Sequence, residues 1–174
     1  MANSCLGGAK TNKEEQIMIW KYMKREDYLD MAYMYATKMT GCLKVAVGSV
    51  IVKDDQMISF GANRAVPSIC ETRGCLRVEK YGNDSKSHRN PEDCRAIHSE
   101  VAAIANLRES ANGATIYVTR YPCEGCAKAI VAAGIKEVVY GGSTQISRMT
   151  QDMFDEFNIR CIWLPDWKED LSDR

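Results

Sequence analysis

Two short segments of the chain carry side chains that can bind a transition metal. His98 is followed two residues later by Glu100, and further along Cys123 and Cys126 are separated by two residues. One imidazole and two thiolates are good zinc ligands, and three protein ligands leave the fourth tetrahedral position to water. Structural zinc usually has four protein ligands. His98, Cys123 and Cys126 are therefore predicted to bind a catalytic zinc ion.

Glu100 is predicted to carry protons rather than to bind the metal. Two residues after His98 on a helix, its side chain diverges from the imidazole, so it need not join the ligands. Zinc lowers the pKa of a bound water molecule to ~7, which provides a hydroxide nucleophile at neutral pH. Glu100 can then take a proton from that water and deliver it to a substrate ring.

Each segment alone has an ordinary explanation. A C-x-x-C pair can be a redox pair or half of a structural zinc site, and H-x-E often arises by chance. Together, in this order and each at the start of a predicted helix, they match the H-x-E…P-C-x-x-C signature of zinc deaminases. Pro122 suits a helix start, and the helix dipole there favours the thiolates of Cys123 and Cys126.

The elements that must position these side chains follow from the hydrophobic pattern. Apolar residues at helical spacing predict helix between Lys13 and about Thr40. After it, the pattern predicts a hairpin of Val47–Lys53 with Gln56–Phe60, helix at Ile97–Leu107, strand at Ala114–Arg120, helix at Cys123–Ala133, strand at Glu137–Tyr140, helix at Arg148–Phe157 and strand at Ile159–Leu164. This order predicts a three-layer α/β domain around a central mixed five-stranded sheet flanked by helices.

Residues 61 to about 93 form a long polar stretch in which we expect no regular structure. Such loops are uncommon unless they are functional or held by something. This one contains Cys70, Cys75 and His88, with Cys94 just beyond it, and these four ligands are enough to close a second, structural zinc site. Free thiols on a surface loop are the alternative. The other cysteines have no identifiable partner, and Cys42 and Cys161 are expected in the core.

Composition narrows the class of protein. The 174 residues suit one domain, with 1–24 as an N-terminal extension (a polar start, then a short helix) and 25–174 as the catalytic domain, including a zinc-binding insertion at 61–95. Basic and acidic side chains number 23 each, which makes nucleic acid an unlikely partner. No segment is apolar enough for a signal peptide or a membrane span, so we expect a cytoplasmic protein that does not bind membranes.

From about Arg25 to Leu164 the sequence resembles the deoxycytidylate deaminases. The resemblance is carried by Cys42–Lys44 with Val47–Asp54, and most closely by Pro122–Ile130 continuing through Ala133–Tyr140. These segments favour that family over the tRNA adenosine, free-cytidine and riboflavin-pathway deaminases. The resemblance implies a cytidine-deaminase-like fold. It also implies hydrolysis of dCMP to dUMP, in which zinc-bound hydroxide attacks C4 and Glu100 carries the proton. It also implies a homo-oligomer, often a hexamer.

The resemblance further suggests a residue that binds the sugar. In that family an Asn in the turn after the second strand binds deoxyribose, and Gly61–Arg64 resembles this turn, so Asn63 is the candidate. Ala62 and Arg64 stand where the family has an aromatic residue and a second glycine, and Ala102 stands where it usually has Asn.

The remaining substrate contacts are proposed from residue type and position. Tyr121 adjoins the cysteine segment and is a candidate for stacking on the base, with Tyr140 as a further candidate. For the phosphate of a nucleotide substrate, the candidates are Lys44, Arg64 and Arg120.

Three alternative functions remain open on the sequence. The nearest is deamination of dCTP or a modified cytosine nucleotide. Deamination of a polynucleotide is disfavoured because it needs a positively charged channel. A catalytically inactive zinc-binding module is the non-enzyme alternative, and the intact Glu100 argues against it.

Overall fold

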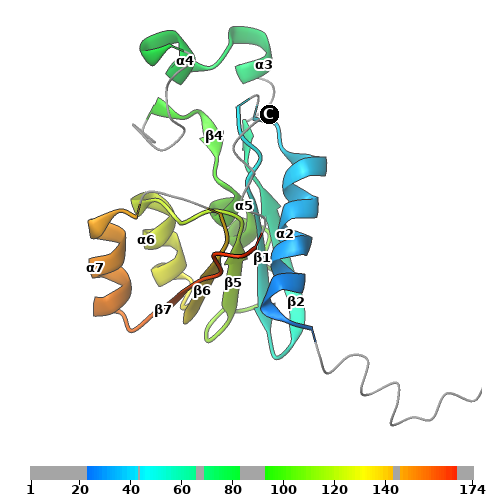
Figure 1. Ribbon diagram of the computed structural model, residues 1–174, viewed down its shortest axis with the longest axis vertical. Coiled ribbons are helices and arrows are strands. Elements are labelled where there is room, and N and C mark those ends of the chain that lie inside the picture. The colour runs from blue at the N-terminus through cyan, green and yellow to red at the C-terminus, as the bar shows by residue number, and fades with distance from the viewer. Residues whose placement is uncertain (1–22, 43, 66–68, 83–92, 143–145, 168–174) are drawn as a thin grey trace, which may run out of the picture.

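A mixed sheet of five strands lies at the centre of the computed structural model, which describes residues 23–42, 44–65, 69–82, 93–142 and 146–167 (Figure 1). The strands are β1 (Gly48–Lys53), β2 (Gln56–Ala62), β5 (Thr115–Val118), β6 (Glu137–Tyr140) and β7 (Arg160–Trp163). Their order is β2-β1-β5-β6-β7. β1 is antiparallel to β2 and β5, whereas β5, β6 and β7 run parallel. The prediction of one mixed five-stranded sheet is confirmed.

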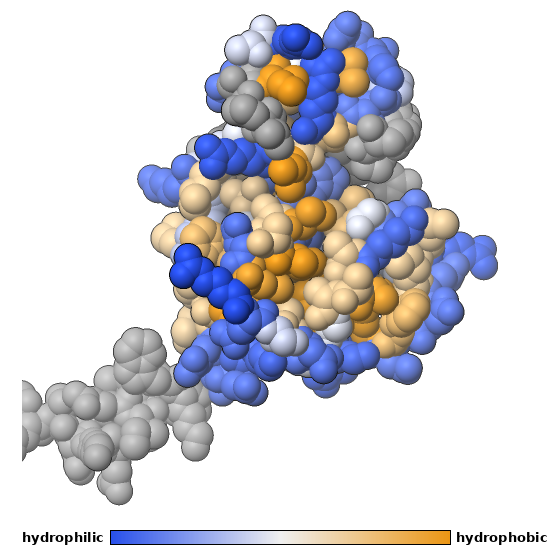
Figure 2. All heavy atoms as spheres, turned by 180° about the vertical axis from the view of Figure 1, so that it is seen from behind, coloured by the Kyte–Doolittle hydropathy of each residue, from blue (hydrophilic) through white to orange (hydrophobic). Residues whose placement is uncertain are grey.

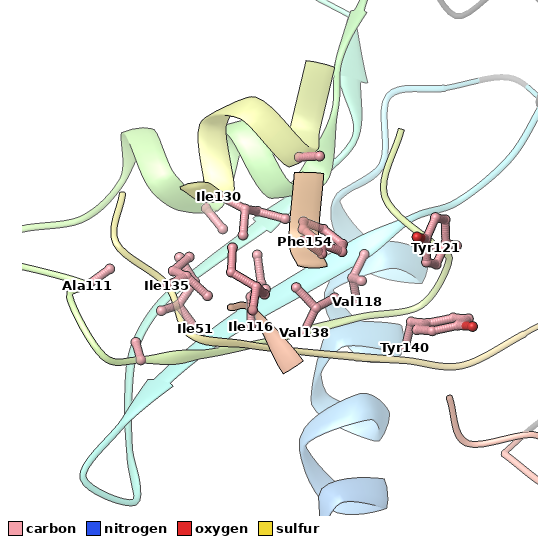
Figure 3. Packing of buried hydrophobic residues seen from close by; sticks show 14 residues of the cluster. Ile51, Ala111, Ile116, Val118, Tyr121, Ile130, Ile135, Val138, Tyr140 and Phe154 are labelled. Atoms are coloured by element: carbon pink, nitrogen blue, oxygen red, sulfur yellow. The ribbon is translucent and has the colours of Figure 1, made fainter. Parts of the chain in front are cut away.

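Helices cover both faces of this sheet. They are α2 (Arg25–Met39), α5 (Ser99–Ala105), α6 (Glu124–Ala132) and α7 (Arg148–Glu156). Successive strand residues point to opposite faces, so Val50 packs in the core beneath α2 while Ile51 packs in the core of α5, α6 and α7. Ile130 and Phe154 are fully buried in that second core (Figure 3). The three-layer α/β prediction is also confirmed.

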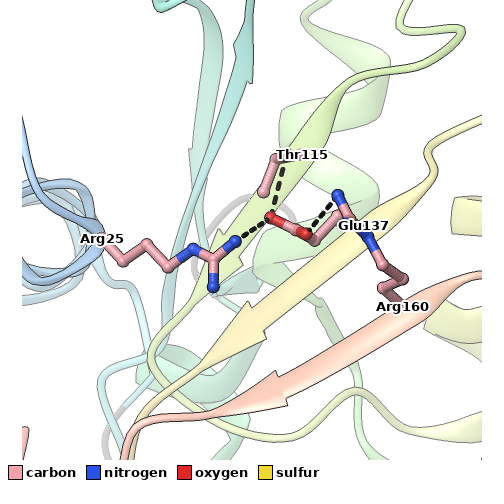
Figure 4. A network of polar contacts seen from close by, with 4 residues as sticks. All are labelled: Arg25, Thr115, Glu137 and Arg160. Atoms are coloured by element: carbon pink, nitrogen blue, oxygen red, sulfur yellow. Dashed lines mark hydrogen bonds and ion pairs between the residues drawn. The ribbon is translucent and has the colours of Figure 1, made fainter.

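Glu137 ties several elements together at one end of the sheet (Figure 4). Its Oε1 atom accepts hydrogen bonds from Arg25 of α2 at 3.1 Å and from Thr115 of β5 at 3.5 Å. Its Oε2 atom lies 2.8 Å from a guanidinium nitrogen of Arg160 on β7. This carboxylate is buried, and its charge is balanced by the two arginines.

α5 packs directly against the backbone of β2 at Gly61. A β-carbon on Gly61 would lie 2.3 Å from the carbonyl oxygen of Ser99 and 2.4 Å from the amide nitrogen of Ala103. Both neighbours are main-chain atoms, so neither can turn aside as a side chain would. The absence of a side chain at Gly61 therefore sets how closely the helix approaches the sheet.

We expect Gly61→Ala to lower the free energy of unfolding by about 1–3 kcal/mol, because overpacking forces the backbone to shift. Thermal unfolding measures the effect. Gly125→Ala is the matched control, since a β-carbon there would meet no atom within 4 Å. An unchanged melting temperature for Gly61→Ala would contradict the packing argument.

The stretch expected to lack regular structure contains short elements. β3 (Arg64–Ala65) pairs antiparallel with β4 (Ala96–Ile97), and α3 (Ile69–Arg73) and α4 (Leu76–Tyr81) lie between them. In Figure 1 these two helices lie beyond one end of the sheet, outside the three layers. The expectation was wrong here because helices of five and six residues are too short to show an apolar period.

The predicted N-terminal helix is confirmed over α2. The proposed extension, residues 1–24, lies almost entirely outside the described residues. None of the helices within the described ranges is long and apolar enough to cross a membrane.

Candidate metal centre and active site

His98, Cys123 and Cys126 meet at the beginnings of two helices. His98 is the N-cap of α5, Cys123 is the N-cap of α6, and Cys126 lies in the first turn of α6. The Nδ1 atom of His98 lies 3.3 Å from the sulfur of Cys123 and 3.4 Å from that of Cys126. In the described structure the side chain of His98 makes no capping hydrogen bond to α5. The side chains of His98 and Cys123 both face the shared cluster.

Close packing makes these groups share protons. The hydrogen bond with Cys126, followed by that with His98, lowers the pKa of Cys123 to about 4 against the effect of burial. The hydrogen bond with Cys123, followed by one with Cys94, raises the pKa of His98 to about 10. Cys123 is thus a thiolate at neutral pH, the form that binds metal. Two sulfurs and an imidazole nitrogen within 4.8 Å of one another fit zinc, which would take the place of the shared protons.

Glu100 lies beside this cluster in the first turn of α5 and is 4% exposed. Burial is the main cause that raises the pKa of its carboxyl group, and the charge of His98 opposes the shift. The carboxyl group hydrogen bonds with the thiol of Cys126 and with the hydroxyl of Ser99. A carboxyl group with a raised pKa is suited to hold a proton and pass it on. A metal-binding cluster and a proton carrier therefore share one site.

Comparison with known families agrees with this geometry. The profile described as the cytidine and deoxycytidylate deaminase zinc-binding region matches residues 23–142. The chain belongs to this family. The description of the family names zinc, which is also the metal that the two sulfurs and the imidazole nitrogen fit.

Individual relatives of this deaminase-family chain include ComE operon protein 2 of Bacillus subtilis, which is 31% identical over 154 residues, or 84% of this chain and 75% of the relative. The deoxycytidylate deaminase of Mycobacterium phage D29 is 34% identical over 114 residues, or 60% of this chain and 84% of the relative. Among solved structures, dCMP deaminase from the cyanophage S-TIM5 in complex with dCMP and dUMP matches with a TM-score of 0.62 at 25% identity, over 82% of this chain and all of that one.

Asn63, the candidate for the sugar, is buried between β2 and β3. Its Oδ1 atom accepts hydrogen bonds from the hydroxyl of Thr40 and the amide of Val47, each at 2.8 Å, and its Nδ2 atom donates to the carbonyl of Val45 at 2.9 Å. The side chain therefore joins Thr40, Val45 and Val47 to the end of β2. Its role toward deoxyribose stays a prediction.

Tyr121 and Tyr140, the candidates for stacking on a base, lie in the core of the deaminase domain (Figure 3). They are 7% and 6% exposed, and their ring centroids are 4.9 Å apart in an edge-to-face contact. Tyr121 also packs against Phe154 and hydrogen bonds with Gln151 of α7. These contacts make packing the main use of both rings here.

Two of the three basic candidates for phosphate binding lie close to His98 or Cys123 along the backbone, and the third lies near Asn63. Arg64 is exposed and pairs through β3 with Ile97, the residue before His98. Arg120 is half-buried three residues before Cys123, and burial lowers its pKa. Lys44 is adjacent to Val45, whose carbonyl accepts a hydrogen bond from Asn63.

The cysteines of the insertion gather around Cys70. Burial raises the pKa of the Cys70 thiol, and the like charges of Cys75, Cys42 and Cys94 raise it further. Cys42 was expected in the core without a partner, but it is half-buried and lies near this group. His88 falls outside the described residues. Of the described residues, only His98, Cys123 and Cys126 bring three ligand atoms within 4.8 Å of one another.

Sequence reasoning missed two contacts at this deaminase site. The thiol of Cys94 hydrogen bonds with His98. Cys94 therefore lies beside the metal-binding side chains as well as beside the insertion. The hydroxyl of Ser99 hydrogen bonds with Glu100. The second has a visible signal, because the residue between His and Glu in this chain carries a hydroxyl group.

Proposed function

We propose that this chain catalyses the hydrolytic deamination of dCMP to dUMP. The observation that carries the proposal is the meeting of a buried carboxyl group with a His-Cys-Cys cluster at the first turns of α5 and α6. The named relatives support the choice of dCMP as the substrate. The phage D29 protein is a deoxycytidylate deaminase, and the S-TIM5 structure holds dCMP and dUMP.

The reaction assigns a role to each side chain of the site. Zinc held by His98, Cys123 and Cys126 would supply a water molecule acidic enough to attack C4 of the cytosine ring. Glu100 accepts a proton from the attacking water and delivers it to N3. It then carries the second proton of that water to the amino group on C4, which leaves as ammonia. The ring gains one oxygen and loses one amino group, so water and dCMP give dUMP and ammonia.

Ammonia release from a panel of substrates tests the proposal. Cytidine, deoxycytidine, dCMP, dCTP and single-stranded DNA are compared at equal concentration. Fastest turnover of dCMP supports it. Faster turnover of dCTP would favour the triphosphate alternative, and turnover of DNA alone would favour a polynucleotide deaminase. No release from any of them, with zinc bound, would favour an inactive zinc-binding module.

A second zinc ion is part of the proposal, with Cys70, Cys75, His88 and Cys94 as its ligands in the insertion at 61–95. The support is the donor set and the electrostatic coupling of Cys70 with Cys75 and Cys94. α3 and α4 bury few side chains, whereas ordering a backbone costs ~1–2 kcal/mol per residue. A structural zinc can contribute ~10 kcal/mol or more at neutral pH, enough to order such a segment.

We expect Cys75→Ser to lower the melting temperature and to raise the KM for dCMP while the catalytic zinc is retained. The insertion begins beside Asn63, so loosening it disturbs the proposed sugar contact. Metal analysis should give about two zinc ions per chain, and one in the variant. Cys161→Ser is the control, because that half-buried cysteine lies on β7 outside both clusters. One zinc per chain that is unchanged in Cys75→Ser would refute the second site.

We also infer a homo-oligomer, a hexamer being the usual form implied by the family. Large apolar side chains are exposed at Ile97 on β4 and Val101 on α5. Seen from behind, hydrophobic residues gather in the middle of the molecule with hydrophilic residues around them (Figure 2). Light scattering of the purified protein tests the inference, and a monomer at micromolar concentration would contradict it.

A further inference from the structure

Two buried serines form a short chain of hydrogen bonds that ends on Glu100. The hydroxyl oxygens of Ser49 and Ser99 are 2.7 Å apart, and the Ser99 oxygen lies 3.0 Å from Oε2 of Glu100. Ser49 and Ser99 are both completely buried, and Glu100 is 4% exposed. All three groups are therefore shielded from bulk water. In such an interior, hydrogen bonds to a charged group are stronger than in water.

The hydrogen bonds between Ser49, Ser99 and Glu100 all point the same way. The hydroxyl of Ser99 donates to Oε2 of Glu100, and a serine hydroxyl has a single proton to donate. Ser99 then accepts from Ser49, because its own proton is already used. Ser49 thus determines which way the hydroxyl of Ser99 points.

Ser49 is in turn held rigidly by the sheet. It lies on β1, a strand with a partner on each side, opposite Gly61 of β2 and Val118 of β5. Ser99 is the first residue of α5, the helix whose approach to the sheet is set by Gly61. The chain of hydrogen bonds therefore runs from the central sheet to the catalytic helix.

We propose that Ser99 is a positioning residue for the proton transfers of Glu100, and that Ser49 orients it. By holding Oε2, Ser99 limits the rotation of the carboxyl group, which also contacts the thiol of Cys126. A Glu side chain has several rotatable bonds, and a proton carrier misplaced by ~1 Å loses much of its rate. This inference rests on the proposed role of Glu100 as the proton carrier.

The test compares three alanine variants of buried serines by steady-state kinetics on dCMP. Ser99→Ala should lower kcat about 10- to 100-fold with KM changed less than ~3-fold, as expected for losing a hydrogen bond to a charged group that acts in the transition state. Ser49→Ala should lower kcat in the same direction by less. It also serves as the second variant if Ser99→Ala does not fold.

Ser59→Ala is the matched control. Ser59 is also buried, and its hydroxyl donates to the carbonyl of Ala103 on the same helix, away from Glu100. It should lower the melting temperature but leave kcat within ~3-fold. A kcat for Ser99→Ala that equals the Ser59→Ala value would overturn the inference, as would a loss that appears only in KM.

Glu100→Gln, measured alongside, separates this inference from the proposed function. Near-normal turnover by Glu100→Gln would defeat the proposed function and this inference with it. Lost turnover in Glu100→Gln together with normal turnover in Ser99→Ala would defeat this inference alone. If Ser99 acts through Glu100, adding Ser99→Ala to Glu100→Gln should cause no further loss.

Discussion

Glu100→Gln is expected to reduce the rate of ammonia release from dCMP by about 10³-fold or more. Gln has nearly the same shape but cannot accept and deliver a proton, and each of the two proton transfers is worth ~10²–10⁴ in rate. The variant should keep its fold and its zinc, because Glu100 lies beside the three proposed ligands and outside their cluster.

Rate, melting temperature and zinc content are measured together for this variant. Glu109→Gln is the control, since Glu109 is exposed in the segment after α5. A loss of zinc in Glu100→Gln would mean that the residue helps to bind metal. A near-normal rate would rule out the proposed proton transfers.

dCMP is expected to exceed deoxycytidine in kcat/KM by about 10²-fold or more. The phosphate lies far from C4, but its binding energy can lower the barrier to reaction at the ring. Two charge-assisted hydrogen bonds to the phosphate, each worth ~1.5–3 kcal/mol, are enough for this ratio.

The exposed Arg64 offers a sharper form of the same experiment. If it contacts the phosphate, Arg64→Ala should lower kcat/KM for dCMP and leave that for deoxycytidine nearly unchanged. A selective loss is needed because general damage to the fold would slow both substrates alike. Equal kcat/KM values for the two substrates in the unmodified protein would point to a nucleoside deaminase.

Local pattern explains which parts could be predicted from the sequence. The β-branched run of β1 and the apolar spacing of α6 are properties of neighbouring residues, so both elements were predicted to within two residues of their bounds. The candidate metal ligands could be predicted because each lies at a helix start beside a distinctive short motif. α5 was predicted too long because β4 occupies the residues before His98.

The features that were missed depend on residues far apart in the chain. Ser49 and Ser99 are brought together by the packing of α5 on the sheet, and no periodic pattern records that contact. The approach of Cys42 to Cys70 has the same origin. For Tyr121, an aromatic residue beside the cysteine motif suits base stacking and core packing equally well, and only the fold distinguishes its neighbours.

His98 and Cys123 occupy N-cap positions, where a residue suited to bind metal stabilises the helix less than a good capping residue would. An N-cap is where Ser, Thr, Asp or Asn strengthens a helix, and such a residue contributes about 0.5–2 kcal/mol over one that cannot cap. In the described structure both N-cap side chains of α5 and α6 turn toward the metal cluster instead. Selection for thermostability alone would therefore replace the two proposed ligands with better caps, and a sequence optimised only to fold would lose the candidate site at these positions first.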